Sequence, residues 1–579
     1  MLLDLIEKEN NFNTIFHRLT AKNELIVHGL TNSAKSFVIA NLFKQLRKHT
    51  LFVVNNHHEA QTYYREIKNL LGENFPVLNF LCQEISPYDQ INSDVQVTSS
   101  QYEIFSAWSE DNPSITIITF KAFSQIYIQK ELLEKSSLEI KCDETIEPLD
   151  LSRKLVELGY SKQFMVENRG QFSHRGDILD VYPLNGEPTR IEFFGDSIES
   201  IRNFSISSQR SINKLEKFSV HPRYSIIRSE NDGLEEKLIS LFKDYSSKLD
   251  EETREGLELS LSHNISAENK LLYWEGVEYY RSILGQGFSS LFDYLPTESN
   301  LQFIFDEWED LLLYNRSWQD KIQAQYEDGI NIGKLLPIES SLYLDAAKIT
   351  EQMKSFKKRL YLQNVEELDS SADDLSVEIR TLPTERFASK VEDFVAYIKK
   401  NIREGERVII FSEQPQRAMG ILKEWDIQCL YFTINEDYEA IPQDHVIIQR
   451  DGLEEGTRIP ELNLLILTDR ELFGRSRQAV ARQKNKKKDK EKELEKHRRK
   501  NAYTDIADLN VDDYVIHYKH GLGIYKGTEM VELTGIGKQE YLILEYAGEA
   551  RVLIPVDQVN LLSRFDMAGD AKPKLSKLG

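Results

Sequence analysis

The chain has 579 residues, of which 40% are hydrophobic and 29% charged, a composition typical of a folded protein with more than one core. At roughly 100–200 residues per domain, this length predicts several domains. The longest apolar runs are far shorter than the about 18 residues of a membrane-spanning helix, and three widely separated cysteines exclude a disulfide framework. We therefore expect a cytoplasmic multidomain protein with no membrane contact.

The net charge of −22 disfavours a general affinity for nucleic acid. One segment departs from this balance, because Arg475–Lys500 holds 13 basic and 4 acidic residues and almost no apolar ones. We interpret residues 475–507 as a solvated basic linker. A tether that binds DNA phosphates is the alternative.

Strand and helix patterns alternate over residues 1–135, which favours a parallel sheet with covering helices. The predicted strands and helices are, in chain order, Glu24–His28, Phe37–Lys48, Leu51–Val54, His57–Leu71 and Ile115–Thr119. We place an α/β unit at these residues, and the nucleotide-loop motifs described below assign it to the first part of a split, degenerate RecA-like core.

The pattern changes over residues 136–220, where glycines separate partly alternating runs such as Asp177–Tyr182 and Thr189–Phe194. Such alternation is typical of half-buried antiparallel strands, so we expect an α+β insertion. Helical periodicity returns at Leu234–Ser262 and Glu268–Leu284, before a buried strand at Leu301–Phe305.

Residues 221–372 are predicted to complete the split core, because the buried strand at Leu301–Phe305 leads into the acidic motif described below. A second, small α/β domain is expected over residues 373–474. Its predicted strands are Val408–Phe411, Cys429–Phe432, Val446–Gln449 and Leu464–Leu467.

Residues 508–567 are dense in short strands separated by turns that contain glycine, which favours a small SH3-like barrel. Residues 568–579 have the composition of a linker. The expected fold class is thus multidomain α/β with a C-terminal β-barrel.

One local motif points to phosphate binding. Gly29-Leu-Thr-Asn-Ser-Ala34-Lys35-Ser36 lies between a predicted strand and a predicted helix, where a phosphate-binding loop belongs. A working loop has a second glycine that lets the backbone wrap the phosphates, a lysine that neutralises them and a hydroxyl that holds magnesium. Ala34 replaces that glycine, so we interpret the loop as a vestigial nucleotide site; weak ATP binding and ATP hydrolysis remain alternatives.

An apolar strand that ends in Asp306 and Glu307 supports this ancestry, because a Walker B motif has that form. Gly29, Lys35, Ser36, Asp306 and Glu307 are therefore predicted to form one vestigial site. No catalytic triad and no metal-ligand spacing is present, so we predict neither catalytic residues nor a metal centre.

A second group of residues indicates a protein partner. Arg175 and Arg190 are predicted beside alternating strands, and Glu192 lies two residues after Arg190, on the same strand face. Arginine and aromatic side chains anchor protein interfaces, whereas ordinary surface ion pairs contribute only about 0–1 kcal/mol. From the residues alone, an interface and a set of surface ion pairs both remain open.

The run from Arg169 to Arg202, with Arg175-Gly-Asp-Ile-Leu-Asp and Arg190-Ile-Glu-Phe-Phe-Gly-Asp, resembles the domain shared by excinuclease B and bacterial transcription-repair coupling factors. The run from Tyr514 to Tyr525 resembles the RNA-polymerase-interacting domain of those factors, which is related to CarD-type regulators. The order of the two modules, with a basic linker between them, is typical of coupling factors. The resemblance covers essentially all 579 residues.

The resemblance implies the N-terminal portion of a longer transcription-coupled DNA repair factor. The other half of that family is an ATP- and magnesium-dependent, helicase-like translocase on double-stranded DNA, and residues 568–579 would begin the linker to it. No cofactor is implied for this portion itself.

The resemblance also implies site residues. By position, Arg175, Arg190, Glu192 and Phe194 match the family's contacts with excinuclease A, the partner of excinuclease B in excision repair. Contact with the RNA polymerase β subunit is expected along one strand and its neighbour, at Tyr525, Val531, Leu533 and Tyr541. The alternatives are a CarD-like transcription regulator without a repair role and an ATP-dependent DNA-binding protein like excinuclease B.

Overall fold

The chain forms two compact units, Met1–Gly474 and Arg475–Gly579. The computed structural model describes residues 3, 10–83, 88, 94–110, 112–229, 231–265, 272–274, 276–338, 342–364, 375–387, 390–432, 441–450, 452–473, 511–517, 521–533, 537–548, 550–555 and 562–564. The predicted linkers at 475–507 and 568–579 lie outside the described residues.

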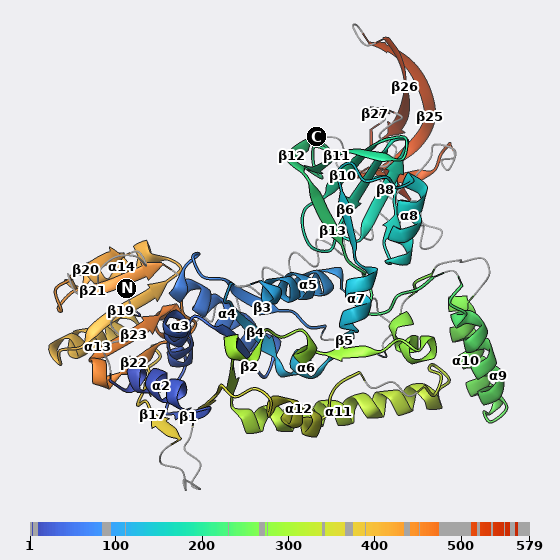
Figure 1. Cartoon of the computed structure of the whole chain (residues 1–579). Helices are drawn as coiled ribbons and strands as arrows, with labels where there is room; N and C mark the ends of the chain where they lie inside the picture. Colours follow the sequence, from blue (N-terminus) through green and yellow to red (C-terminus); the bar gives the residue numbers. More distant parts are fainter. Residues whose placement is uncertain are drawn as a thin grey trace. The chain divides into compact units, whose positions relative to one another are not determined.

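The first unit is built around a seven-stranded parallel sheet in the order β17-β1-β16-β15-β2-β4-β3 (Figure 1). In chain order its strands are β1 (Glu24–His28), β2 (His49–Val54), β3 (Val77–Phe80), β4 (Ile115–Thr119), β15 (Leu301–Asp306), β16 (Arg359–Gln363) and β17 (Ser376–Glu378). Strands β2, β4 and β15 are buried at every position, since helices cover both faces of a parallel sheet. Segments from both ends of the unit thus share one sheet.

The chain between and beside these strands is largely helical. In chain order the helices are α2 (Asn10–Ala21), α3 (Ala34–Leu46), α4 (His57–Leu71), α5 (Val95–Ser109), α6 (Phe120–Ser124), α7 (Lys130–Ser136), α9 (Leu234–Ser246), α10 (Glu251–Ile265), the 3₁₀ helix η1 (Val277–Leu284), α11 (Trp308–Asn331) and α12 (Ala346–Met353). Of these, α9, α10 and η1 share a core that contains none of the strands of this sheet. A short antiparallel pair, β5 (Ile126–Ile128) with β14 (Phe288–Ser290), lies beside them.

Between β4 and β15 the chain forms a mainly antiparallel six-stranded sheet in the order β12-β11-β10-β9-β8-β7. Its strands are β7 (Ser161–Lys162), β8 (Gln171–Arg175), β9 (Ile178–Tyr182), β10 (Thr189–Phe194), β11 (Ser197–Phe204) and β12 (Ser211–Leu215), with the pair β6 (Leu138–Lys141) and β13 (Lys217–Val220) beside them. Leu179 and Ile191 on one face pack in one core with Leu151 and Leu155 of α8 (Pro148–Glu157). The other face of β9 and β10 carries the charged residues Asp180, Arg190 and Glu192.

A third sheet in the first unit has the order β18-β22-β23-β19-β21-β20 and mixes parallel and antiparallel pairs. Its elements are β18 (Leu382–Pro383), α13 (Val391–Arg403), β19 (Arg407–Ser412), α14 (Pro415–Glu424), β20 (Cys429–Phe432), β21 (Val446–Arg450), β22 (Thr457–Ile459), β23 (Leu464–Thr468) and α15 (Asp469–Phe473). Ile409 and Ile447 join the same buried core as Leu25 of β1 and Phe37 of α3. This small α/β layer therefore packs directly against the first sheet.

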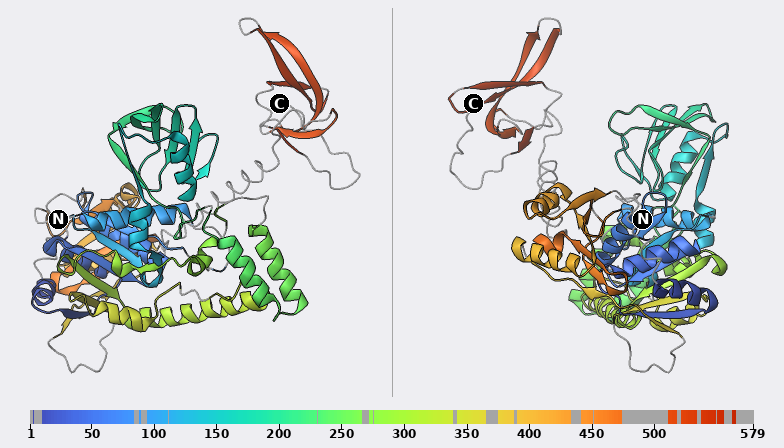
Figure 2. Two further views of the ribbon diagram at one scale, coloured as in Figure 1. Left: turned by 45° about the vertical axis from the view of Figure 1, so that its right-hand side comes forward. Right: turned by 90° about the vertical axis from the view of Figure 1, so that its left-hand side faces the viewer.

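The second unit holds one antiparallel five-stranded sheet in the order β27-β26-β25-β24-β28. Its strands are β24 (Tyr514–His517), β25 (Gly521–Leu533), β26 (Gly537–Glu545), β27 (Arg551–Pro555) and β28 (Leu562–Arg564). Figure 2 shows β25 and β26 as a long two-stranded ribbon.

The architecture is thus mixed α/β with several sheets, one of them parallel, as predicted. The helical periodicity predicted over Leu234–Ser262 corresponds to two helices, because α9 ends at Ser246 and α10 begins at Glu251. The Asp250 carboxylate accepts the Thr253 N–H at 2.9 Å, which favours a new helix start there. Of the predicted helix Glu268–Leu284, the described residues show only the 3₁₀ segment η1.

Candidate partner-binding surfaces and the vestigial loop

Arg175 and Arg190 are brought together by Asp180, which no sequence motif predicted as a site residue. Strands β8, β9 and β10 are antiparallel neighbours, and their register places Asp180 directly opposite Arg190. Arg190 donates from Nε to Asp180 Oδ1 at 2.6 Å and from Nη2 to Oδ2 at 2.9 Å, while Arg175 Nη2 donates to Oδ2 at 2.9 Å. The Asp180 side chain is only 1% exposed, so one buried carboxylate orients two guanidinium groups.

The two arginines differ in what they offer to a partner. The hydrogen bonds to Asp180 raise the pKa of Arg190 above its ordinary value, and its guanidinium lies 4.9 Å from the centroid of the Phe204 ring. The Arg175 side chain is 41% exposed against 15% for Arg190. Arg175 therefore presents more of its charge to solvent, and Arg190 is the more firmly held.

Glu192 and Phe194 lie further along β10, after Arg190. Glu192 accepts a hydrogen bond from Ser200 Oγ at 2.5 Å and pairs with Arg202 Nη2 at 3.2 Å. Phe194, at the end of β10, is 81% exposed. The four sequence-predicted residues thus lie on β8 and β10, on either side of β9, and only Phe194 has most of its side chain exposed.

A second exposed aromatic residue extends this surface. Phe164 is 85% exposed, and the Arg175 guanidinium lies 6.0 Å from the centroid of its ring. The sequence signal that could have found it is the short apolar run Phe164-Met165-Val166, which ends several residues before the strand of Arg175. We call Phe164, Arg175, Arg190 and Phe194, with Asp180 beneath them, the arginine face.

The vestigial loop is held by ion pairs and hydrogen bonds within the chain. Lys35 Nζ, at the start of α3, donates to Asp306 Oδ1 at 2.6 Å and to Glu307 Oε1 at 2.8 Å, at the end of β15. Burial opposes the charge of Lys35, but these two ion pairs outweigh it, so the pKa of Lys35 is raised. The structure therefore places together the lysine and the two acids that the sequence predicted.

The loop backbone is also already bonded. The Thr31 N–H donates to Thr381 Oγ1 at 2.7 Å, and the Ala34 N–H donates to the Thr31 carbonyl at 3.1 Å. Gly29 adopts φ +84°, and a Cβ there would lie 2.7 Å from the Ile379 carbonyl oxygen. This glycine is thus required by local packing, whether or not a phosphate binds.

Helix α4 supplies a partner for the serine that would hold magnesium. Ser36 Oγ donates to Glu66 Oε2 at 2.5 Å, and Ser33 Oγ donates to Glu66 Oε1 at 2.7 Å. The Glu454 N–H also donates to Glu66 Oε1, at 2.8 Å, so the small α/β layer closes over this carboxylate. Burial raises the pKa of Glu66, although these three hydrogen bonds favour its charged form.

A cavity of about 450 Å³ adjoins the loop and is rich in acids. Its charged lining consists of Lys35, Glu59, Asp306, Glu307 and Asp310. Burial, followed by the charge of Asp306, raises the pKa of Glu59. Four carboxyl groups against one ammonium group make this a poor site for a triphosphate.

In the second unit, the predicted contact residues fall into two groups. Tyr525 is 4% exposed and packs with Leu542 and Leu544 in the small core, so its side chain does not lie on the surface of the unit. Val531 and Leu533 lie in the outer half of β25, opposite Gln539 and Gly537 of β26. Tyr541 is half-buried and lies opposite Glu529.

The outer half of β25 has a strand on one side only within the described residues. β24 pairs with β25 only as far as Ile524, whereas β26 pairs with it up to Leu533. Residues 528–533 therefore present a strand edge.

The described residues lack the features of a metal centre or a membrane span. No group of three His, Cys, Asp or Glu residues that could hold a metal ion occurs in the part of the chain that the structure describes. None of the described helices is long and apolar enough to cross a bilayer.

Three family models match separate parts of the chain. They are the UvrB interaction domain at residues 138–225, the Rossmann-like domain of cyanobacterial Mfd at 383–474, and the CarD-like/TRCF RID domain at 509–566. The first match contains the arginine face, and the last contains β24 to β28.

Curated proteins named transcription-repair-coupling factor match along the whole chain. The protein of Staphylococcus haemolyticus is 22% identical over 588 residues, and that of Staphylococcus epidermidis is 24% identical over 595. Each alignment covers 100% of this chain and 48% of the relative, so the chain spans about half the length of these relatives. The resemblance to the coupling factors is thereby confirmed.

Among solved structures, S. tokodaii Xpd4 is similar over 76% of this chain and 79% of its own, with a TM-score of 0.20 and 10% identity. An XPD helicase is similar over 77% and 80%, with a TM-score of 0.21 and 8% identity. Likenesses this distant carry no argument about the fold or the function.

Proposed function

We propose that this chain, which matches transcription-repair-coupling factors over its whole length, is a two-ended adaptor of transcription-coupled DNA repair. One end is the arginine face, which binds excinuclease A. The other end is the second unit, which binds RNA polymerase. By joining the two, the chain directs excision repair to a stalled polymerase.

The observation that carries this proposal is the Asp180 clamp within the segment that matches the UvrB interaction domain. A single carboxylate orients Arg175 and Arg190, the exposed Phe164 ring lies 6.0 Å from the Arg175 guanidinium, and the exposed Phe194 ends the strand of Arg190. Isolated surface ion pairs would not require exposed aromatic residues, whereas arginine beside aromatic side chains is the usual composition of an interface hot spot. The same composition favours an acidic, partly apolar surface on the partner.

For the polymerase end, we propose that the second unit is a small SH3-like barrel that binds the polymerase β subunit through strand addition along residues 528–533. An exposed strand edge is a template for another chain, and an apolar side chain on it gives specificity. Val531 and Leu533 lie on this edge, and Tyr541 lies on the neighbouring strand. Tyr525 supports the sheet from inside rather than contacting the partner.

We further propose that residues 1–135 and 221–372 form a split RecA-like core whose loop no longer binds nucleotide. The lysine is neutralised by Asp306 and Glu307, Ser36 is bonded to Glu66, and acids line the adjoining cavity. We therefore do not assign to this loop the ATP-driven movement on DNA that the resemblance implies for the longer proteins of the family.

A titration with a fluorescent ATP analogue tests the vestigial loop. Neither the wild-type chain nor Lys35→Ala is expected to bind at micromolar concentrations. Micromolar binding that Lys35→Ala abolishes would instead support the ATP-dependent alternative that resembles excinuclease B.

Calorimetry with excinuclease A tests the adaptor at its arginine face. The wild-type chain is expected to bind, and Arg175→Ala/Arg190→Ala to weaken binding by at least about tenfold, as loss of hot-spot residues does. Arg153→Ala/Arg254→Ala removes the same charge from two exposed helical arginines and should leave binding intact. Equal binding by all three chains would reject this interface.

A further inference from the structure

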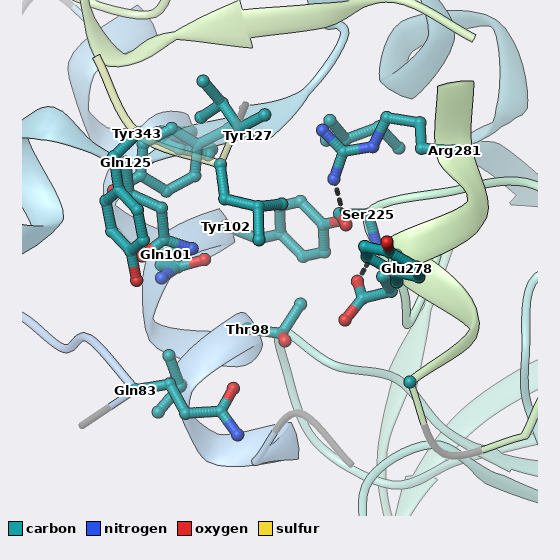
Figure 3. Close-up of a pocket in the computed structure, with 17 residues that line it drawn as sticks. Gln83, Thr98, Gln101, Tyr102, Gln125, Tyr127, Ser225, Glu278, Arg281 and Tyr343 are labelled. Atoms are coloured by element: carbon teal, nitrogen blue, oxygen red, sulfur yellow. Dashed lines mark hydrogen bonds between the residues drawn. The ribbon is translucent and has the colours of Figure 1, made fainter. Parts of the chain in front are cut away.

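A separate cavity of about 140 Å³ lies in the first unit and shares no residue with the arginine face or the vestigial loop (Figure 3). Helix α5, strand β5 and the 3₁₀ segment η1 supply most of its walls. Five of the 17 residues that line it are aromatic, against 10% of the whole chain. Aromatic walls of this kind favour a ligand with a flat ring. The five are Tyr102, Phe105, Tyr127, Tyr279 and Tyr343.

The hydroxyl of Tyr102 has no hydrogen-bond partner among the described residues, although Tyr102 is only 6% exposed. Its oxygen keeps some accessible surface, and in Figure 3 the side chain reaches from α5 into the middle of the cavity. By contrast, the Tyr127 hydroxyl donates to the Ala122 carbonyl and the Tyr279 hydroxyl to the Leu336 carbonyl. Because buried hydroxyl groups are normally hydrogen-bonded, that of Tyr102 is expected to bond to something held in the cavity.

Two carboxamides add an acceptor and a donor to the same walls. Gln101 Nε2 donates to the Leu81 carbonyl at 3.1 Å, which leaves its Oε1 available as an acceptor. Gln125 Oε1 accepts from Cys82 Sγ at 3.4 Å, which leaves its Nε2 available as a donor. Carboxamides beside a hydroxyl match a ligand edge that both donates and accepts hydrogen bonds, as the edge of a nucleobase does.

The cavity offers little positive charge to a phosphate. Its one cationic lining residue among those described is Arg281, whose Nη2 already donates to Ser225 Oγ at 2.6 Å, while Nε and Nη1 each expose less than 1 Å². The carboxylate of Glu278 accepts the Ser225 N–H at 2.6 Å, and its charge opposes an anion. An uncharged ligand is therefore favoured over a nucleotide or a nucleic-acid strand.

We propose that this cavity binds a nucleobase, in the form of a free purine nucleoside, with its ring against the aromatic walls and its edge on Tyr102 and the two carboxamides. Adenine is the favoured base, because carboxamide side chains bind its donor–acceptor edge in pairs. Without a charge-assisted contact, binding is expected at millimolar concentrations, above the range of the ATP titration of the vestigial loop. The site goes beyond the adaptor role, since it lies outside both partner surfaces.

Saturation-transfer difference NMR on the intact chain measures binding of adenosine, cytidine and benzyl alcohol. Adenosine is expected to receive the most saturation from the wild-type chain, and benzyl alcohol, which has a ring but no base edge, the least. Thr98→Phe fills the cavity from α5 and should weaken adenosine binding by at least about fivefold, as loss of base stacking does. Ser106→Phe adds the same ring at an exposed position of α5 and should change nothing.

Tyr102→Phe removes only the unpartnered hydroxyl, so it gives a second test should Thr98→Phe not fold. It is expected to weaken adenosine binding several-fold, as loss of one hydrogen bond does. No transfer to adenosine, equal transfer to benzyl alcohol, or adenosine binding unchanged in both variants would overturn the proposal.

A short oligodeoxyadenylate separates the two sources of an adenine base. It should bind the wild-type chain more weakly than adenosine, because the cavity has little charge to offer its phosphates. Tighter binding of the oligonucleotide that Thr98→Phe abolishes would overturn the free nucleoside and assign the base to a strand.

Discussion

At the scale of single residues, Asp180 decides the geometry of the arginine face. It is buried and bonded to two guanidinium groups, yet both arginines retain some access to water. Asp180→Ala is therefore expected to lower the free energy of unfolding by about 1–3 kcal/mol, the usual cost of unsatisfied partners of a buried polar group. Urea denaturation measures this loss.

The same variant has a functional consequence that simple destabilisation would not produce. Folded Asp180→Ala should bind excinuclease A more weakly under conditions where it is fully folded, because its arginines are no longer oriented. Asp180→Asn, which keeps the shape and part of the hydrogen bonding, should lie between Asp180→Ala and the wild type. Wild-type affinity in folded Asp180→Ala would show that Asp180 does not position the face.

Glu66 gives a pH-dependent prediction. Burial raises its pKa in the folded chain above the ordinary 4.5. At a pH between the unfolded and the folded pKa, the folded state therefore binds more protons than the unfolded state. The charge of Glu66 therefore lowers the free energy of unfolding increasingly as pH rises from 4.5 through its folded pKa. Glu66→Gln removes this effect. The free energy of unfolding of Glu66→Gln should rise relative to wild type over this range.

Urea denaturation of both chains across that pH range checks the effect, because other titrating groups cancel in the difference. A difference that stays flat, or that moves in favour of the wild type as pH rises, would mean that the hydrogen bonds to Glu66 outweigh its burial.

The sequence motifs grouped charged residues into candidate sites but did not indicate which side chains hold them in place. Lys35, Asp306 and Glu307 were grouped by motif, and the structure brings them together. Asp180 was missed as a site residue because its partners are defined by the pairing of three strands. Glu66 was missed because its partners Ser36 and Glu454 lie 30 and 388 positions away in the sequence.

At the scale of elements, the edge of β25 is expected to carry polymerase binding. Val531→Glu places a charge at the proposed apolar contact and should weaken binding to RNA polymerase by at least about tenfold. Met530→Glu introduces the same charge one residue earlier, on the opposite face of the strand, and should have a smaller effect. Met530 is exposed, so this control should fold.

A pull-down of RNA polymerase by each variant measures this difference. Loss of binding in Met530→Glu together with full binding in Val531→Glu would place the contact on the other face of the ribbon.

The strands were predicted more accurately than the helices. Glu24–His28 and Ile115–Thr119 are strands with the predicted bounds, because buried parallel strands are short apolar runs with clear ends. The boundary between α9 and α10 was missed, since the apolar spacing continues across a break that Asp250 creates by a local hydrogen bond. Hydrophobic periodicity does not report such a competition.

At the scale of the whole molecule, the chain consists of two compact units, and each carries one proposed partner surface. The arginine face lies in the first unit, and the strand edge at residues 528–533 lies in the second. Because the two surfaces share no residue, loss of one partner should leave binding of the other unchanged.

Sedimentation velocity of the chain mixed with RNA polymerase and excinuclease A tests this bridging role most directly. The wild-type chain is predicted to form one complex that contains all three components. Arg175→Ala/Arg190→Ala should lose only excinuclease A from that complex, and Val531→Glu only the polymerase. Two separate complexes that never join, or loss of both partners in either variant, would contradict the two-ended adaptor.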